Sequence, residues 1–371
     1  REGWGFFRNR RPDTYQDLAV TGNVLPHDIQ TPAQRGYHMP AEWEPHDAVW
    51  LAWPHNDLTF PHLAAVEETY LKIISSLQNE PIKLLIPNLA YKEKVTHLLS
   101  LKGIQSDSLQ FFSVPYSDVW IRDYGPIFVT NRALHESAAV FWEFNAWGNK
   151  YDEPLLDGIK TRGLFETFSM LIFRPGIILE GGSIDTNGRG TLLTTKQCLL
   201  NKNRNPQLSP EEIEQYLCSY LGVEKIIWLE KGIAGDDTDG HIDDIARFVN
   251  PTTIVCAVEN NPEDDNYELL RENFMILSSA TDQDDNPLTV VPIPMPCPVM
   301  DDSLRYPASY LNFYIGNHVV LVPTFEDVHD QRVLAIFRDL FPDRTVIGIS
   351  ARKMVEGFGT IHCATQQQPS A

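Results

Sequence analysis

The chain has 371 residues, of which 43% are hydrophobic and 22% charged, the composition of an ordinary globular protein with a sizeable core. Its 50 acidic and 30 basic residues give a formal net charge of −20. This balance argues against nucleic acid as a partner, because a phosphate backbone is bound by clustered Lys and Arg, and most of the charge is expected to be a solvated acidic surface.

The five cysteines are few, odd in number and widely spaced, with no CxxC pair: Cys198, Cys218, Cys256, Cys297 and Cys363. This pattern predicts neither a disulfide framework nor a thiolate zinc site, and it favours a reducing, cytoplasmic setting. No apolar run approaches the ~18 residues of a membrane span, and the first thirty residues lack the apolar core of a signal peptide. We therefore expect no membrane partner.

The chain is expected to hold one folded domain, over residues 37–371. No Gly/Ser linker, low-complexity tract or abrupt change of composition marks a boundary within it. Residues 1–36 are polar and begin with Arg rather than Met. We expect them to be an N-terminal arm that is poorly ordered or left from processing.

Runs rich in β-branched and aromatic residues predict strands along the whole chain, at 48–53, 82–86, 111–114, 127–130, 138–144, 177–179, 191–194, 225–229, 245–249, 252–258, 288–292, 311–315, 318–322 and 345–349. Helical periodicity predicts helices at 63–79, 91–101, 210–221, 266–279 and 331–340. The third of these has a clear start, because Ser209 is a good N-cap and Pro210 suits the first helical position.

The order of these elements repeats: a hairpin, then a helix, then a single strand, as at 245–292 and again at 311–349. Such recurrence predicts a radial or tandem array of small α/β units rather than a doubly wound sheet. An α+β sandwich built from the same elements stays open as the alternative.

Familiar nucleotide, zinc-protease and serine-hydrolase signatures are absent, and chemistry concentrates in four polar segments near strand ends. The first, 118–126, holds Asp123, which could receive a cation; alternatively Arg122 pairs with a neighbouring acid and Trp120 packs. The second, 179–183, presents Glu180 where two glycines allow close approach, although a plain glycine turn is the commoner explanation.

The third segment, 235–244, surrounds His241 with carboxylates. A calcium loop fails, because its first and last ligand positions hold Gly235 and Ala246. In an extended chain His241 and Asp243 share a face, which suits a metal site or a base beside an acid, and a solvated acidic loop stays open. In the fourth segment, 357–365, Cys363 lies in a glycine-punctuated polar loop where a thiolate nucleophile is possible, unlike the other cysteines.

The spacing of these segments suggests that they meet. Asp123 precedes Glu180 by 57 residues, Glu180 precedes His241 by 61, and His241 precedes Cys363 by 122, which is twice 61. If one structural unit spans about sixty residues, equivalent strand ends converge on one axis and the four segments share a pocket.

The strings MPAEWEPHDAVWLAWP (39–54), DVWIRDYGP (118–126), LEGGSIDTNGRGTLLTT (179–195), DTDGHIDDIARF (237–248) and IHCATQQQP (361–369) resemble the agmatine deiminase family of the guanidine-modifying, or pentein, superfamily. The resemblance covers nearly all of the chain from Met39. It implies an α/β fold, a five-bladed propeller of repeated ββαβ units with pseudo-fivefold symmetry. The same branch contains a bacterial peptidylarginine deiminase.

By that resemblance, Cys363 is the nucleophile, His241 the general acid/base, Asp123 and Asp243 the guanidinium ligands, and Glu180 their support. The implied reaction hydrolyses agmatine to N-carbamoylputrescine and ammonia through an S-alkylthiouronium on the cysteine, with no cofactor or metal. The resemblance also implies a homo-oligomer. One departure is Gly-Phe-Gly at 357–359, where the family has three glycines, and this leaves the shape of the cysteine loop open.

The far end of agmatine is an ammonium, which carboxylates and aromatic faces bind well. Candidates for this end are Trp120, Trp147, Asp237 and Asp239, and Arg122 and Gly181 complete the predicted substrate-binding set. Three other functions stay open: a peptidylarginine deiminase, a non-catalytic polyamine binder, and a metal-dependent hydrolase using the acids at 236–244.

Overall fold

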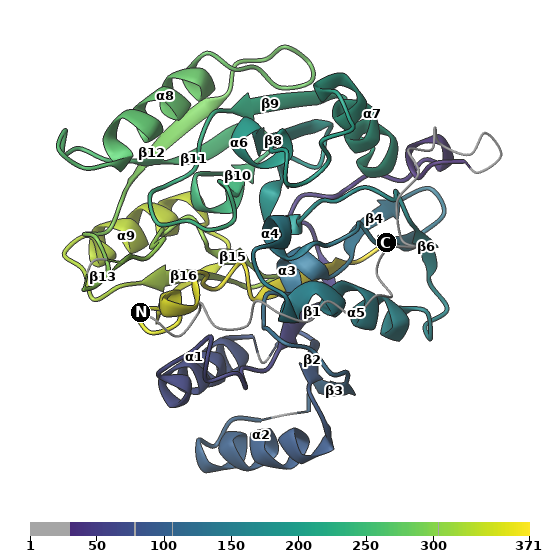
Figure 1. Ribbon diagram of the computed structural model, residues 1–371, viewed down its shortest axis with the longest axis vertical. Coiled ribbons are helices and arrows are strands. Elements are labelled where there is room, and N and C mark those ends of the chain that lie inside the picture. Colours follow the sequence, from purple (N-terminus) through teal and green to yellow (C-terminus); the bar gives the residue numbers. More distant parts are fainter. Residues whose placement is uncertain (1–29, 78, 106, 303) are drawn as a thin grey trace. The chain divides into compact units, whose positions relative to one another are not determined.

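A computed structural model describes residues 30–77, 79–105, 107–302 and 304–371, and five of its sheets repeat one connection pattern (Figure 1). In each, a first strand pairs antiparallel with a second, and a third runs parallel to the second. Four sheets have three strands: β4 (Ile127–Asn131), β5 (Glu136–Val140) and β6 (Leu171–Phe173); β7 (Asp185–Thr186), β8 (Thr191–Thr195) and β9 (Lys225–Leu229); β10 (Ala246–Asn250), β11 (Thr253–Val258) and β12 (Thr289–Pro294); β15 (Tyr314–Ile315), β16 (Val319–Thr324) and β17 (Thr345–Ser350). The fifth has β18 (Thr365–Pro369), β1 (His46–Ala52), β2 (Ile82–Ile86) and β3 (Leu109–Ser113), and β13 (Met300–Asp301) and β14 (Leu304–Arg305) form a separate hairpin.

A helix lies between the parallel strands of every repeat, as parallel pairing requires a crossover. These crossover helices are α1 (Leu63–Ser76), α2 (Leu89–Leu101), α5 (Asp157–Phe165), α7 (Pro210–Leu221), α8 (Asn266–Ser278) and α9 (Asp330–Leu340). The hairpin, helix and strand order predicted from the sequence is thus confirmed. The predicted start of α7 is also confirmed, because the Ser209 hydroxyl accepts from the Glu212 N–H at 3.2 Å and the Glu212 carboxylate accepts from the Ser209 N–H at 2.7 Å.

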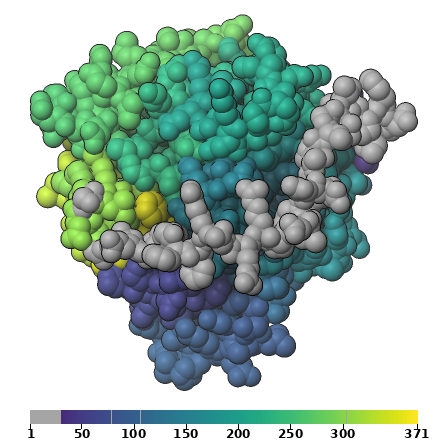
Figure 2. Space-filling model, in the orientation of Figure 1, coloured from purple at the N-terminus to yellow at the C-terminus, as the bar shows by residue number. Residues whose placement is uncertain are grey.

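The shorter helical turns are η1 (Ala33–Arg35), α3 (Ile121–Tyr124), α4 (Ala146–Asn149), η2 (Glu153–Leu156), η3 (Gly181–Ser183), α6 (Lys196–Leu199), η4 (Ile242–Asp244) and η5 (Val355–Gly357). Residues 31–371 form one compact unit. Most of the predicted arm, 1–36, lies outside the described residues, and its boundary at residue 37 stays a prediction. On the face seen in Figure 2, the repeats follow one another in chain order, from blue through teal and green to yellow-green.

The last strand, β18, was not anticipated, because its sequence Thr-Gln-Gln-Gln-Pro reads as a polar run. It is nevertheless buried and pairs antiparallel with β1, which joins the two ends of the described fold in one sheet. Two of its three glutamines have side-chain hydrogen bonds: Gln368 Oε1 accepts from Trp50 Nε1 at 3.0 Å and from Lys83 Nζ at 2.8 Å, and Gln367 Oε1 accepts from Arg122 at 2.7 Å. Buried amides with such partners are compatible with a core strand.

Four other differences from the sequence prediction concern weak patterns. The predicted strand at 177–179 is reduced to a bridge between Ile178 and Glu143, and the one at 311–315 to Tyr314–Ile315. Helix α5 and strand β6 were missed. Polar residues fix the start of α5, because the Asp157 carboxylate accepts from the Ser117 N–H at 3.0 Å, a long-range bond that periodicity cannot reveal. None of the described helices is long and apolar enough to cross a membrane.

His46, on β1, gives the fold a measurable pH dependence. It is buried, and burial lowers its pKa to about 4. Between pH 4 and 6.5 the unfolded chain binds a proton at His46 that the folded chain does not. The free energy of unfolding is therefore highest above pH 6.5 and decreases as the pH falls through this range. We expect the wild type to lose about 2–3 kcal/mol more than His46→Asn between pH 7 and 4.5, measured by urea unfolding. The exposed His62 provides the control variant His62→Asn. If the free energy of unfolding of wild type and of His46→Asn changed equally with pH, the prediction would be contradicted.

Candidate active site

The four polar segments occupy the same place in their repeats, in the turn before the first strand. Asp123 lies on α3 before β4, Glu180 precedes η3 and β7, His241 and Asp243 lie at η4 before β10, and Cys363 precedes β18. Contacts link α3 to η3, η3 to η4, and α3 to β18. The structure therefore brings together the segments that the sixty-residue spacing predicted to meet.

Gly182 marks the point where three of these side chains converge. A Cβ at this position would lie 2.6 Å from His241 Nδ1, 2.9 Å from Asp123 Oδ1 and 3.1 Å from Asp243 Oδ2. At Gly181 a Cβ would lie 2.2 Å from the backbone oxygen of Arg122. The close approach suggested by the glycine pair is thus observed, and any side chain at position 182 would displace the His241 imidazole or the Asp123 carboxylate and crowd Asp243.

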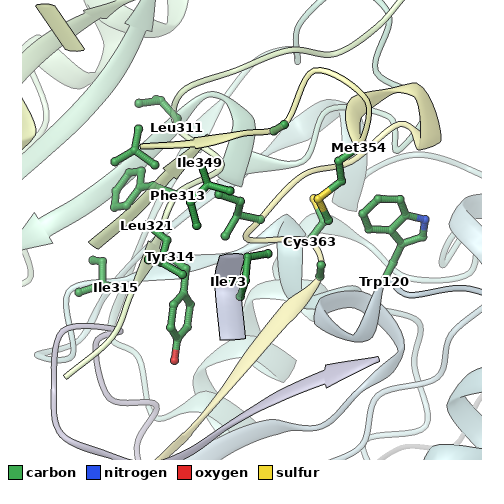
Figure 3. Close-up of a cluster of buried hydrophobic side chains, with 14 of the residues drawn as sticks. Ile73, Trp120, Leu311, Phe313, Tyr314, Ile315, Leu321, Ile349, Met354 and Cys363 are labelled. Atoms are coloured by element: carbon green, nitrogen blue, oxygen red, sulfur yellow. The ribbon is translucent and has the colours of Figure 1, made fainter. Parts of the chain in front are cut away.

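Cys363 adjoins the same cluster. Its Sγ lies 3.7 Å from Asp243 Oδ2 and accepts a hydrogen bond from Asn312 Nδ2 at 3.1 Å. Figure 3 draws Cys363 with Trp120 and Met354 among the surrounding buried side chains. Burial, together with the charges of nearby carboxylates, raises the pKa of this thiol well above its usual range. In the free protein the thiol is therefore neutral.

Asn312 is a site residue that the sequence interpretation missed. It lies in the turn before β15, the equivalent position in the remaining repeat, and its Oδ1 accepts from the N–H of Cys363 at 3.3 Å and from Thr360 Oγ1 at 2.8 Å. The signal was present: the doubled interval of 122 residues between His241 and Cys363 left one repeat without an assigned polar residue. Asn312 also fixes the loop that presents the thiol.

A buried hydrogen-bonded chain runs behind the thiol, from Asp243 through His362 to Glu42. His362 Nδ1 lies 2.7 Å from Asp243 Oδ2, and its Nε2 lies 2.8 Å from Glu42 Oε2. Burial works to raise the pKa of Asp243, but the hydrogen bond and charge of His362 outweigh it, so the pKa lies below its usual value. His362 and Glu42 were not predicted, although His362 adjoins the cysteine in the sequence.

The pKa of Asp123 is shifted in the opposite direction from that of Asp243. It accepts from Trp147 Nε1 at 2.9 Å and from the Gly182 N–H at 3.0 Å, yet burial and the charge of Asp243 raise its pKa well above the usual range. Asp243 Oδ1 has no hydrogen-bond partner among the described residues. Two neighbouring buried carboxylates of this kind favour a bound cation, which would relieve their repulsion and supply the missing donor.

His241 is buried, and burial lowers its pKa to about 3, so its ring is neutral near pH 7. Its Nδ1 lies 3.7 Å from Asp123 Oδ1, and neither ring nitrogen has a hydrogen-bond partner among the described residues. A neutral imidazole in this setting can accept a proton from a nearby group. Glu180, fully buried, accepts from Arg204 Nε at 2.6 Å through Oε1, while its Oε2 has no partner within the described part of the chain.

Two of the predicted substrate-binding residues support the cysteine loop and the turns beside it. Arg122 donates to the carbonyl of His362 at 3.3 Å and to Gln367 Oε1 at 2.7 Å. The Trp120 ring packs against Phe60 and lies where a Cβ at Gly359 would fall. Their role toward a substrate stays a prediction, as does that of Gly181.

The two acids proposed to bind the amine end of agmatine, Asp237 and Asp239, already have polar partners within the protein. Tyr151 donates to Asp237, whose burial raises its pKa to about 6. Asp239 accepts from Arg204 NH1 at 2.9 Å and pairs with Lys150 at 2.8 Å. The third candidate, Trp147, donates its indole N–H to Asp123. Lys150 therefore offsets part of the negative charge expected there, and the assignment of these residues to the amine end stays a prediction.

Phe358, the departure from a triple glycine, takes a left-handed backbone conformation with φ 68°. This is the conformation that glycine adopts most easily. The flanking glycines are sterically required, because a Cβ at Gly357 would lie 2.4 Å from the Phe60 ring and one at Gly359 would lie 2.6 Å from the Trp120 ring. Of the three positions 357–359, only the middle one thus accommodates a side chain.

Substituting Gly182 by alanine is expected to lower activity about 100-fold or more, because the added methyl group must displace His241 or the carboxylate of Asp123. Steady-state kinetics measure the loss. Gly163→Ala is the matched control, since Gly163 lies in α5 with no atom within 4 Å of an added Cβ. Equal activity of the two variants would count against the convergence at Gly182.

Comparison with known proteins agrees with this geometry. Residues 38–369 match the family of Porphyromonas-type peptidyl-arginine deiminases. An agmatine deiminase of Medicago truncatula is 35% identical over 390 residues, covering 93% of this chain and 99% of the plant protein. The solved agmatine deiminase of Enterococcus faecalis superposes with a TM-score of 0.82 at 31% identity, over 92% of this chain and 98% of that one.

A Campylobacter jejuni agmatine deiminase solved with substrate bound gives a TM-score of 0.80 at 31% identity, over 90% of this chain and 96% of that one. The α/β fold is therefore the pentein fold of these enzymes. The chain belongs to the Porphyromonas-type peptidyl-arginine deiminase family.

Proposed function

We propose that this chain is an agmatine deiminase, which hydrolyses agmatine to N-carbamoylputrescine and ammonia. The observation that carries the proposal is the placement of the Cys363 thiol 3.7 Å from Asp243, in a cluster that also contains Asp123 and His241. Similarity to enzymes named agmatine deiminase supports the choice of substrate. The three side-chain types supply a nucleophile, a base and a cation site.

Binding depends on Asp123 and Asp243. A guanidinium is planar and presents N–H donors in a fixed fork, so carboxylates in its plane each accept paired hydrogen bonds. The unpartnered Oδ1 of Asp243 and the raised pKa of Asp123 both favour such a ligand. Glu180, with its own unpartnered oxygen, extends the acidic wall. The central carbon stays open above the plane.

In the first half of the reaction, the bound cation stabilises the thiolate, and neutral His241 takes the thiol proton. The Cys363 sulfur attacks the guanidinium carbon. The C–N bond to one amino group then breaks, and His241 returns the proton to that nitrogen, which leaves as ammonia. An S-alkylthiouronium remains on Cys363, and no proton is gained or lost in this half.

In the second half, neutral His241 accepts a proton from water, whose oxygen attacks the same carbon. The C–S bond breaks and the sulfur is reprotonated, which restores the thiol and gives the ureido product with release of one proton. That proton combines with the ammonia. Every step uses residues of this chain.

The burial of this cluster favours a slender substrate. Cys363, Asp243 and His241 are 6%, 0% and 1% exposed, so a linear alkyl chain fits the approach better than a folded protein. A peptidylarginine deiminase is the alternative within the same branch, as the name of the matching family records. We place Trp120, Trp147, Asp237 and Asp239 near the amine end of agmatine, with Arg122 and Gly181 shaping the site.

We also infer that the five repeats are blades of an α/β propeller with pseudo-fivefold symmetry and that residues 37–371 form the catalytic domain. The recurring strand order and the shared position of the site residues support this. A homo-oligomer follows from family resemblance. Five free cysteines support a reducing, cytoplasmic setting.

Ammonia release tests the proposed function, measured in parallel on agmatine, free arginine and a peptide with a C-terminal arginine, each with and without EDTA. We expect agmatine to give the highest kcat/KM and EDTA to leave the rate unchanged. Faster turnover of the peptide would establish the alternative deiminase. Loss of activity in EDTA would point to a metal-dependent hydrolase, and binding without turnover to a polyamine binder.

A further inference from the structure

A second buried cysteine lies beside the proposed catalytic histidine. Glu180, Cys198 and His241 each offer one possible metal-ligating atom, and these atoms all lie within 4.8 Å of one another. Cys198 belongs to α6, whereas Glu180 and His241 precede η3 and η4, so three separate segments supply the cluster. All three residues are buried. The proposed reaction uses no group of Cys198.

Unsatisfied polar atoms point to a ligand at this cluster. Glu180 Oε2 and both ring nitrogens of His241 are buried without a hydrogen-bond partner among the described residues. Buried polar atoms normally have partners, so these are available to a bound group. Arg204 holds the other carboxylate oxygen at 2.6 Å, an orienting contact of the kind that surrounds metal ligands.

The donor set is chemically selective. A thiolate, an imidazole and a carboxylate together suit Zn²⁺, which binds sulfur at about 2.3 Å and nitrogen or oxygen at about 2.0–2.2 Å in tetrahedral geometry. Ligand atoms already within 4.8 Å need only small side-chain rotations to reach such distances. The three ligands leave a fourth tetrahedral position open.

We propose that Glu180, Cys198 and His241 form a binding site for a thiophilic divalent cation, Zn²⁺ above all. On binding, the S–H bond of Cys198 breaks, the proton leaves to solvent and a Zn–S bond forms, while the carboxylate and the neutral imidazole bind without proton release. Zn²⁺ with one thiolate and one carboxylate is neutral overall. Glu180 also pairs with the buried Arg204, whose charge is shared with Asp239 at 2.9 Å.

Inhibition follows from the shared histidine. A metal on one ring nitrogen of His241 opposes protonation of the imidazole, which must accept the thiol proton, and it withdraws Glu180 from the acidic wall. This consequence rests on the proposed function, whereas the binding of zinc does not. The metal is thus an inhibitor of the reaction and not a participant in it.

Direct binding tests the site in protein freed of metal by chelation. Zn²⁺ affinity is measured by competition with a chromophoric chelator, and Co²⁺ is added to detect a thiolate-to-metal absorption band. We expect one tight ion per chain, and we expect Cys198→Ala to weaken Zn²⁺ binding at least about 100-fold and to lose the band. Cys198→Ser, which keeps the volume, provides a second variant should the alanine variant fold poorly.

Two controls separate this site from other thiols. Cys297 forms a second cluster with Asp327 and His329 at the surface, so Cys297→Ala tests whether the ion binds there instead. Cys363→Ala tests the nucleophile. Both are expected to keep the tight ion and the band. Unchanged binding in Cys198→Ala, or loss of binding in either control, would overturn the proposed site.

Activity gives the second readout. In EDTA, Cys198→Ala is expected to turn over agmatine at close to the wild-type rate, and micromolar Zn²⁺ to inhibit the wild type at least tenfold more strongly than the variant. Equal inhibition of both would remove the link to Cys198. A wild type inactive in EDTA would contradict the proposed function, while the binding measurement would still decide the metal site.

Discussion

Replacing Cys363 by alanine is expected to abolish ammonia release from agmatine, with a fall of at least about 10⁴-fold in kcat. The reason is that the Cys363 sulfur lies 3.7 Å from Asp243, beside the place proposed for the guanidinium carbon. Binding of agmatine, measured by calorimetry, should persist, because the carboxylates are unchanged. Mass spectrometry of acid-quenched wild type during turnover should show an adduct on the peptide that contains Cys363.

Cys256→Ala is the matched control for this substitution. Cys256 is also a buried free thiol, and burial raises its pKa to about 12, but it lies within strand β11. The control should keep both activity and the adduct on the Cys363 peptide. Residual activity above about one per cent in Cys363→Ala, or an adduct on another peptide, would contradict the covalent mechanism.

Replacing Asp243 by asparagine is expected to lower kcat/KM for agmatine about 10²- to 10³-fold. The amide has one acceptor oxygen and no charge, and it turns an N–H toward either the guanidinium or His362. Removing one partner of a buried ion pair costs about 3–5 kcal/mol, and 1.4 kcal/mol corresponds to a factor of ten. Steady-state kinetics on agmatine provide the measurement, and calorimetry should show weakened substrate binding.

Asp157→Asn serves as the comparison for Asp243→Asn. Asp157 is equally buried and lies on α5, where it accepts hydrogen bonds from the N–H groups of Ser117 and Asp118 and not from a group of the proposed substrate site. It should lose stability in thermal unfolding without a comparable loss of kcat/KM. If both variants retain normal kinetics, the carboxylate of Asp243 does not hold the substrate.

Much of the fold could be predicted from local patterns in the sequence. The Ser209-Pro210 start fixed α7, because capping and proline preferences act within one turn. The repeated hairpin, helix and strand were likewise visible, since apolar periodicity reflects which face of each element is buried. Strand β18 was hidden because the partners of its Gln368 side chain, Trp50 and Lys83, lie far away in the chain.

The candidate site shows the same division. The sixty-residue spacing predicted that Asp123, Glu180, His241 and Cys363 lie in one pocket, because equivalent turns of a repeat converge. Asn312 escaped it, since an asparagine in an apolar segment carries no local sign of a bond to a distant sulfur. The contact between Glu42 and His362 was hidden for the same reason, because 320 residues separate the two side chains.

The sequence by itself determined the repeat, the acidic segments and the identity of the reactive residue types, all of which depend on chemistry within a few residues. The tertiary structure alone decided their electrostatic states. Asp243 is kept ionised by His362, Asp123 has a raised pKa, and the imidazole of His241 is neutral. Burial and through-space charge set these states, and both arise only when turns from different repeats pack against one another.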